Sequence, residues 1–401
     1  MLLPIGDHPN PRGTAVVNGT LILFNVLLFL LVTVPLSSQA IDPNVPGAVD
    51  YVWKISHSTG EYVAALLEQL SAYDLYVYQH GFRPEDPSLQ ALFFSMFLHA
   101  GWMHLLGNML FLWIFGDNVE ARLGRLGYLV SYLGTGAMAT LFHAMLQWGS
   151  PLPMIGASGA ISGVLGLYFV WFPENRVRMF LFLYWYVDVF LVPARWVLGF
   201  YLLVENLLPF LLGGGVGSVA YSAHIGGFVA GVVLAHTVRF VERRREPDRT
   251  GVEPLEDERL LDEEGEEGEA ARSSRVHRAL RQGRPELAVR GYFELHGRER
   301  ARLSSTQVLS MGDWLMEQNR TDVALTLFQQ FLATHPRDPG AAAVHVRCGL
   351  IRLYRHGRPT DAYQHLAAAM RLGAPVELHP QIDQALADIE RLQRLQGQWG
   401  R

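Results

Sequence analysis

Long apolar stretches fill the first 240 residues of the chain and are separated by short polar segments. A helix that crosses a bilayer needs ~20 mainly apolar residues. Stretches of about this length lie at 19–36, 98–117, 127–147, 157–172, 194–211 and 222–239. The pattern predicts an all-α chain, in which a six-helix transmembrane bundle at 19–240 follows an N-terminal cytoplasmic tail at 1–18.

One further apolar run, MFLFLYWYVDVFLV at 179–192, is interrupted by Asp188 and is separated from the next helix by Pro193. We interpret it as a membrane-embedded connection, and a seventh span is the alternative. Basic residues concentrate in cytoplasmic loops, so the arginines distinguish the two. With six spans and both termini in the cytoplasm, all the arginine clusters beside the spans fall inside: Arg122 and Arg125; Arg176 and Arg178; Arg239, Arg243, Arg244 and Arg245.

The chain changes character after residue 240. Residues 253–269 hold ten acids and one base, which predicts a charged, self-repelling linker at 241–272. An internal repeat then occupies 273–401. The segments RQGRPELA, EQNRTDVA and RHGRPTDA end at Ala288, Ala324 and Ala362, at intervals of 36 and 38 residues.

Paired helices at this period, with small residues where the helices touch, resemble tetratricopeptide (TPR) repeats. We therefore expect a helical repeat domain at 273–401 with a concave surface that binds a protein partner. The alternative is a helical tail that packs only on itself.

Composition agrees with a membrane half and a soluble half. Half of the residues are hydrophobic and 18% are charged, below the ~25% of ordinary soluble domains. A net charge of −5 gives no support for nucleic-acid binding. The single cysteine, Cys348, excludes an intramolecular disulfide. We expect the first apolar run to be a retained anchor, because only Arg12 precedes it and no small-residue cleavage site follows.

Several polar side chains fall where lipid is expected, and such residues are functional candidates by default. They are His99, His104, Asn108, Ser158 and His224. The stretch GASGAISGVLG at 156–166 places small residues next to Ser158. His224, Gly227 and Gly231 share one helical face. Packing of these two small faces predicts that Ser158 comes within hydrogen-bond reach of His224.

A serine beside a histidine is the minimum for nucleophilic acyl transfer, because the imidazole accepts the hydroxyl proton. No aspartate lies nearby in sequence, so we expect a dyad, with Glu205 and Asp188 as the nearest candidates to orient the histidine. His104 and Asn108 are four residues apart and can donate to a developing oxyanion. A metal held by the three histidines, or a structural or transport role, remains an alternative.

At these residues the chain resembles the rhomboid intramembrane serine proteases. The resemblance covers about residues 15–240. It rests on FLHAGWMHLLGNMLFLWIFGDNVEARLG at 97–124, GASGAISGVLGLY at 156–168 and AHIGGFVAG at 223–231. It implies a six-helix membrane fold and hydrolysis of membrane-protein substrates in or beside their transmembrane segments, without metal or cofactor. It also implies a multi-pass protein, which we expect in a bacterial plasma membrane with the active site near the outer face.

The resemblance assigns a role to each matching residue. Ser158 corresponds to the nucleophile and His224 to the general base, while His104, Asn108 and the backbone from Gly156 to Ser158 stabilise the oxyanion. Supporting roles fall to His99, Glu120 and Arg122. Some members carry an aromatic residue one turn after the nucleophile, where this chain has Ser162, so we expect an aromatic from another helix to hold His224. The alternative function is a catalytically silent rhomboid-like scaffold.

Overall fold

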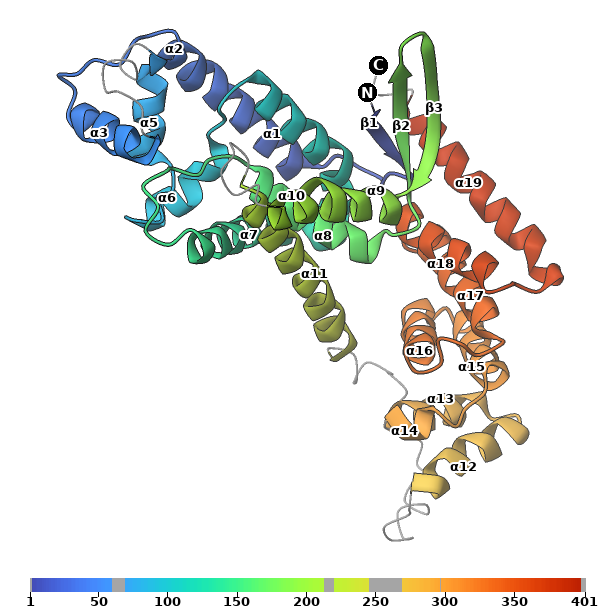
Figure 1. The fold of residues 1–401 in the computed structure, drawn as a ribbon. Coiled ribbons are helices and arrows are strands. Elements are labelled where there is room, and N and C mark those ends of the chain that lie inside the picture. Colours follow the sequence, from blue (N-terminus) through green and yellow to red (C-terminus); the bar gives the residue numbers. More distant parts are fainter. Residues whose placement is uncertain (1, 60–68, 213–219, 245–268, 296, 398–401) are drawn as a thin grey trace. The chain divides into compact units, whose positions relative to one another are not determined.

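The computed structural model describes residues 2–59, 69–212, 220–244, 269–295 and 297–397. The chain divides into two compact units, Met1–Thr237 and Val238–Arg401, each of which can be followed by colour in Figure 1. The first unit corresponds to the predicted membrane half and the second to the predicted soluble half. Most of the predicted acidic linker lies outside the described residues.

The first unit is mainly helical. Its helices are α1 (Val16–Leu28), a π-helix (Phe29–Thr33), α2 (Val34–Ser37), α3 (Ala48–Thr59), α5 (Ala72–His80), α6 (Leu89–Phe94), a 3-10 turn (Ser95–Phe97), α7 (Trp102–Leu146), α8 (Ser158–Trp171), α9 (Ala194–Phe200), a second π-helix (Tyr201–Leu207), α10 (Leu208–Leu211) and α11 (Tyr221–Arg244).

Four helical stretches among the described residues are long and apolar enough to cross a membrane: Val16–Ser37, Trp102–Leu146, Ala194–Leu211 and Tyr221–Glu242. Helix α7 is broken at Gly124, which has a φ of 74° and a ψ of 168°. This left-handed conformation suits glycine, and it divides α7 into two arms over the predicted stretches 98–117 and 127–147. Helix α8 covers the predicted stretch 157–172 but has only 14 residues.

The prediction of an all-α chain is wrong at the apolar run 179–192. This run lies in a hairpin of strands β2 (Arg176–Leu183) and β3 (Tyr186–Pro193). Leu183 pairs with Tyr186, and Tyr184 has a φ of 54° in the turn between them. The run is rich in β-branched and aromatic residues, which favour strands over helices, and this explains why the connection is a hairpin and not a seventh spanning helix.

The expected N-terminal tail at 1–18 contains strand β1 (Leu2–His8), which pairs antiparallel with β2 to give the sheet order β1-β2-β3. Asp7 of this strand is buried. Its carboxylate accepts hydrogen bonds from the Tyr168 hydroxyl and, at 2.9 Å, from Asn118 Nδ2. Burial, and then the nearby Asp117, raises the pKa of Asp7 well above its usual range. These contacts fix the strand to α7 and α8.

Helices α8 and α11 touch through glycines, as the spacing of small residues predicted. A Cβ added at Gly227 would lie 2.1 Å from the Gly159 carbonyl oxygen, and one at Gly231 would lie 2.0 Å from that of Gly163. Neither position has room for a methyl group. The two backbones are therefore in direct contact along this face, which is the arrangement that small residues permit in membrane helices.

We predict that Gly231→Ala destabilises the first unit by about 1–3 kcal/mol, because overpacking a tight contact forces the helices apart. Gly199→Ala in α9 is the matched control, since an added Cβ there meets nothing within 4 Å. Thermal unfolding in detergent measures both variants. Equal midpoints for the two variants would contradict the close α8–α11 contact.

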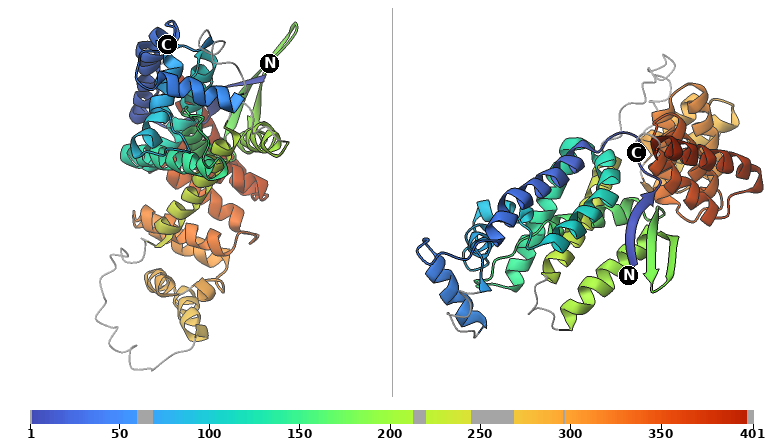
Figure 2. Two further views of the ribbon diagram at one scale, coloured as in Figure 1. Left: turned by 60° about the vertical axis from the view of Figure 1, so that its left-hand side comes forward. Right: turned by 90° about the horizontal axis from the view of Figure 1, so that it is seen from above.

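The second unit is described by itself. Its helices are α12 (Glu269–Arg281), α13 (Pro285–Glu294), α14 (Gly297–Arg300), α15 (Ser305–Glu317), α16 (Thr321–Thr334), α17 (Ala341–Tyr354), α18 (Pro359–Arg371), a 3-10 turn (Val376–Leu378) and α19 (His379–Gly397). Figure 2 gives two further views of these helices.

The sequence repeat coincides with successive helix pairs, α12 with α13, α15 with α16, and α17 with α18. The three repeated alanines, Ala288, Ala324 and Ala362, are fully buried near the starts of the second helices. Gly312 of α15 faces the Phe328 ring of α16, where an added Cβ would lie 2.1 Å from the ring. Small residues therefore occupy the contacts within the pairs.

Cys348 of α17 is fully buried, and burial raises the pKa of its thiol to about 12. At pH 8 the thiol is therefore protonated as well as inaccessible. We predict that it does not react with a maleimide while the second unit is folded, and reacts when the unit is unfolded in denaturant. Mass spectrometry after timed labelling measures this, and rapid labelling of the folded protein would contradict the packing of α17.

Candidate active site

Ser158 and His224 lie together where α8 and α11 begin. Ser158 is the first residue of α8, and His224 lies in the first turn of α11. The Ser158 Oγ is 2.7 Å from Nε2 of His224. The contact that the glycine spacing predicted is therefore present, because the close packing of α8 on α11 aligns their first turns.

Asn206 is the third member of this chain of hydrogen bonds, and sequence reasoning missed it. Its Oδ1 lies 2.6 Å from Nδ1 of His224, while its Nδ2 donates to the Tyr201 carbonyl oxygen at 2.7 Å. The second bond fixes the orientation of the amide. Nδ1 of His224 then carries the proton, and its Nε2 is free to accept the Ser158 hydroxyl proton.

The carboxylates considered from the sequence do not orient His224. Glu205 is exposed, and its neighbour Asn206 is the residue that turns inward. Asp188 lies in β3, where it accepts from the Tyr186 hydroxyl at 3.0 Å and the Val189 N–H at 2.8 Å. A search for an acid could not find Asn206, because an amide oxygen performs the same hydrogen-bonding task without a charge.

An aromatic from another helix lies near His224, as the presence of Ser162 led us to expect. The Tyr201 ring centroid is 6.5 Å from that of His224, with an interplanar angle of 31°. The Tyr201 hydroxyl is 2.7 Å from the Oγ of Ser162, which is fully buried. Ser162 therefore fixes the position of the Tyr201 ring through this hydrogen bond. Tyr201 and Asn206 both belong to the π-helix between α9 and α10, a form that often marks functional sites.

Two side chains of α7, His104 and Asn108, are the candidate hydrogen-bond donors of the site. His104 lies against Gly156, where an added Cβ would be 2.8 Å from His104 Nε2 and 3.7 Å from Ser158 Oγ. Gly156 has a φ of 121°, so glycine is required both for the backbone and for the close approach. Asn108 is buried on the same helix one turn later, and its Nδ2 has no partner among the described residues. An unpaired buried donor of this kind suits an oxyanion.

His99 packs against His104 and supports its position. The residue is fully buried, and its ring meets that of His104 edge-on at 5.1 Å between centroids. The His99 carbonyl oxygen accepts a hydrogen bond from the Tyr73 hydroxyl at 2.9 Å. His99 thus joins the segment before α7 to α5 and limits the movement of His104.

Glu120 and Arg122 lie toward the other end of this arm of α7 and contact neighbouring helices. The Glu120 carboxylate accepts the backbone N–H groups of Val17 and Asn18, at 3.1 and 2.7 Å. It therefore caps the first turn of α1, whose N–H groups have no partner within the helix. The Arg122 guanidinium lies over the Trp171 ring, 4.7 Å from its centroid, at the end of α8. Both residues join α7 to its neighbours.

The histidines of the site are not arranged as metal ligands. Within the part of the chain that the structure describes, no group of three or more His, Cys, Asp or Glu side chains could hold a metal ion. The arrangement of Ser158, His224 and Asn206, with donors at His104 and Asn108, can instead perform nucleophilic acyl transfer.

Comparison with known proteins identifies the first unit. The pattern of the rhomboid domain matches residues 86–240. The mitochondrial rhomboid protein 1 of Saccharomyces cerevisiae is 32% identical over 158 residues, which cover 38% of this chain and 43% of that protein. The rhomboid protease GluP of Bacillus subtilis is 33% identical over 138 residues, 34% of this chain and 24% of its own length.

The match to a third relative covers a larger part of that relative's length. The uncharacterized protein Rv1337 of Mycobacterium tuberculosis is 32% identical over 192 residues, 46% of this chain and 72% of that protein. By contrast, this chain spans less than half the length of the yeast and Bacillus relatives. The matched domain at 86–240 includes Ser158, His224 and Asn206. The chain is an integral membrane protein that belongs to the rhomboid family.

Proposed function

We propose that the chain is an intramembrane serine endopeptidase that hydrolyses peptide bonds in or beside the transmembrane segments of membrane proteins. The observation that carries the proposal is the continuous hydrogen-bond chain from Ser158 through His224 to Asn206. The buried Nδ2 of Asn108, which has no partner among the described residues, supports it, because such a donor is available to bind an oxyanion.

The geometry supports a two-step reaction. His224 Nε2 accepts the proton as Ser158 Oγ attacks the scissile carbonyl carbon, and the same nitrogen then delivers the proton to the leaving amine. The carbonyl oxygen becomes an oxyanion that Asn108 Nδ2, His104 and the backbone at the start of α8 stabilise by hydrogen bonds. Water then repeats the attack on the acyl-enzyme and releases Ser158.

We further propose six membrane spans, with the two arms of α7 and the short α8 counted as separate crossings. Both termini are then cytoplasmic, and Ser158 lies near the outer face of a bacterial plasma membrane. A substrate helix must unwind locally before cleavage, because its carbonyl groups are bonded within the helix. The proposal therefore places cleavage near the outer end of the substrate's span.

For the second unit we propose TPR-like repeats that bind a protein partner. Polar contacts link the first helices of successive pairs. His277 of α12 lies 3.2 Å from Gln307 of α15, and Arg347 of α17 donates to Asp313 of α15 at 2.8 Å. These contacts hold the first helices side by side, and such a row forms the binding surface of helical repeat proteins.

We predict that purified protein in detergent reacts with a fluorophosphonate and cleaves a transmembrane substrate, and that Ser158→Ala and His224→Ala each lose both activities. The loss in cleavage should be at least ~10³-fold, as for other serine nucleophiles and their bases. Ser131→Ala, a membrane serine on α7, is the matched control and should keep both activities. Gel fluorescence and product analysis measure the two readouts.

Two outcomes of this experiment would contradict the proposal. Cleavage that survives in Ser158→Ala would exclude the assigned nucleophile. A folded wild-type protein that neither reacts with the probe nor cleaves any of a panel of transmembrane substrates would favour the silent scaffold.

We predict that Asn206→Ala lowers kcat by roughly 10- to 100-fold, the equivalent of one hydrogen bond to the catalytic histidine. Asn206→Asp keeps an acceptor oxygen at Nδ1 of His224, but it buries a charge and sets its second oxygen against the Tyr201 carbonyl oxygen, so we expect it to recover only part of the rate. Glu205→Gln, which changes the exposed neighbour, is the control and should match wild type. Steady-state kinetics should show a change in kcat with little change in KM, and an unaltered kcat for Asn206→Ala would exclude a positioning role.

A further inference from the structure

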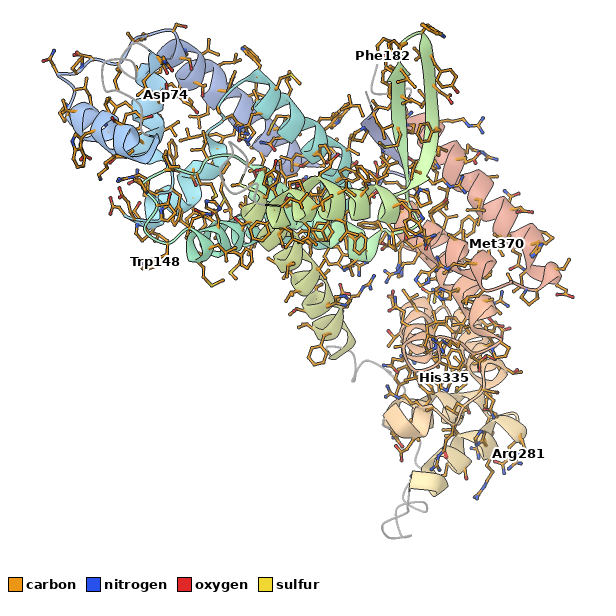
Figure 3. All side chains as sticks on the ribbon, in the orientation of Figure 1. Asp74, Trp148, Phe182, Arg281, His335 and Met370 are labelled. Carbon is orange, nitrogen blue, oxygen red and sulfur yellow. The ribbon has the colours of Figure 1, made fainter. Side chains whose placement is uncertain are left out.

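The distal half of the β2–β3 hairpin is an exposed apolar projection. Val177 and Met179 near its base are buried, whereas every residue from 182 to 191 is exposed. Trp185 at the turn is 93% exposed. Figure 3 labels Phe182 on this distal half. A patch of aromatic and aliphatic side chains of this kind is not stable in water and indicates an interaction surface.

The hairpin lies at the end of the first unit opposite the Ser158–His224 pair. Ser158 begins α8, and β2 starts shortly after α8 ends. Strand β3 runs directly into α9, and the π-helix that follows α9 carries Asn206. Figure 1 shows the sheet beside the start of α9. Helix α8 has 14 residues and is about 21 Å long, less than the ~30 Å of the hydrocarbon layer. Because the hairpin follows the end of α8 that points away from Ser158, the topology proposed above places the base of the hairpin toward the inner boundary of the membrane.

The apolar surface of the hairpin is continuous with surfaces that face lipid. Beyond Pro193, Trp196 and Phe200 of α9 are 66% and 52% exposed. On the other side, Ile5 and Arg178 of the sheet line an open pocket together with the exposed Trp113 of the spanning helix α7. The sheet thus lies beside exposed apolar residues of two candidate membrane spans, Trp102–Leu146 and Ala194–Leu211.

The polar residues of the hairpin match the chemistry of a membrane surface. Arg176 and Arg178 are exposed at its base, and the far end has the turn residues Tyr184 and Trp185 followed by Tyr186, the first residue of β3. Basic residues at the headgroup level are typical of the interfacial layer, and so are Trp and Tyr side chains. The hydrogen-bonded carboxylate of Asp188 keeps the hairpin out of the hydrocarbon centre, because a charge there is costly.

We propose that this hairpin inserts into the interfacial layer of the leaflet opposite the Ser158–His224 pair, with its apolar residues against acyl chains and its basal arginines among anionic headgroups. Its partner is lipid, not protein. The hairpin is then a lateral anchor of the bundle, joined to the membrane helix that carries Tyr201 and Asn206 by a single proline. The inference depends on membrane insertion of the first unit and not on its proposed activity.

The test measures the depth of a fluorophore at the tip of the hairpin. Trp185→Cys in full-length protein with Cys348→Ala is labelled with bimane and reconstituted into vesicles of phosphatidylcholine and phosphatidylglycerol. Leu31→Cys in the spanning stretch Val16–Ser37 and Val376→Cys in the second unit, 73% and 75% exposed, give the reference values for lipid and water. We expect quenching at 185 by lipids with a shallow doxyl group, several-fold more than at 376, and weak quenching by iodide.

Three results would overturn the proposal. Iodide quenching at 185 equal to that at 376 would place the hairpin in water. Protection from both iodide and doxyl lipids would mean that protein covers it. Energy transfer between labelled copies that disappears on dilution with unlabelled protein would identify a second copy as the cover. The same vesicles, assayed with a transmembrane substrate, report the protease activity independently of the depth measurement.

Discussion

The contact between the backbones of α8 and α11 is the constraint on which the candidate site depends. Gly227 and Gly231 press against the carbonyl oxygens of Gly159 and Gly163, with no space for a side chain. Lipid supplies no hydrophobic force between helices, so close packing of this kind provides the attraction. Because both helices begin at the same level, their first turns meet, and Ser158 and His224 come into hydrogen-bond contact.

The rest of the site is arranged around that contact by neutral groups. Asn206 is hydrogen-bonded to Nδ1 of His224, and Ser162 is hydrogen-bonded to the hydroxyl of Tyr201. Gly156 has no side chain and so leaves space for the His104 ring. A carboxylate in place of Asn206 would bring a buried charge into a region of low dielectric, with a large desolvation cost. The amide provides the acceptor and avoids this cost, which suits the intramembrane site that we propose.

Sequence patterns predicted the parts of the structure that depend on short spacings. The interval between His224 and Gly231 and the glycines after Ser158 define helix faces, so the Ser158–His224 contact could be predicted. Asn206 could not, since its position depends on a π-helical turn that no local pattern indicates. The sequence analysis did not predict the hairpin, because an apolar run of 14 residues beside predicted spans resembles a membrane segment. Pairing of its strand β2 with Leu2–His8 is what distinguishes a hairpin from such a segment.

Helix α9 and the π-helix that follows it connect the β2–β3 hairpin with the candidate active site. One end continues into the β2–β3 hairpin, and the other carries the side chains that hold His224. Because Ala194–Leu211 is one continuous helical stretch, a tilt of one end moves the other. Thickness or headgroup charge in one leaflet could therefore change the alignment of the imidazole near the other. The rate of such an enzyme would then vary with the composition of a monolayer that its substrate's scissile bond never touches.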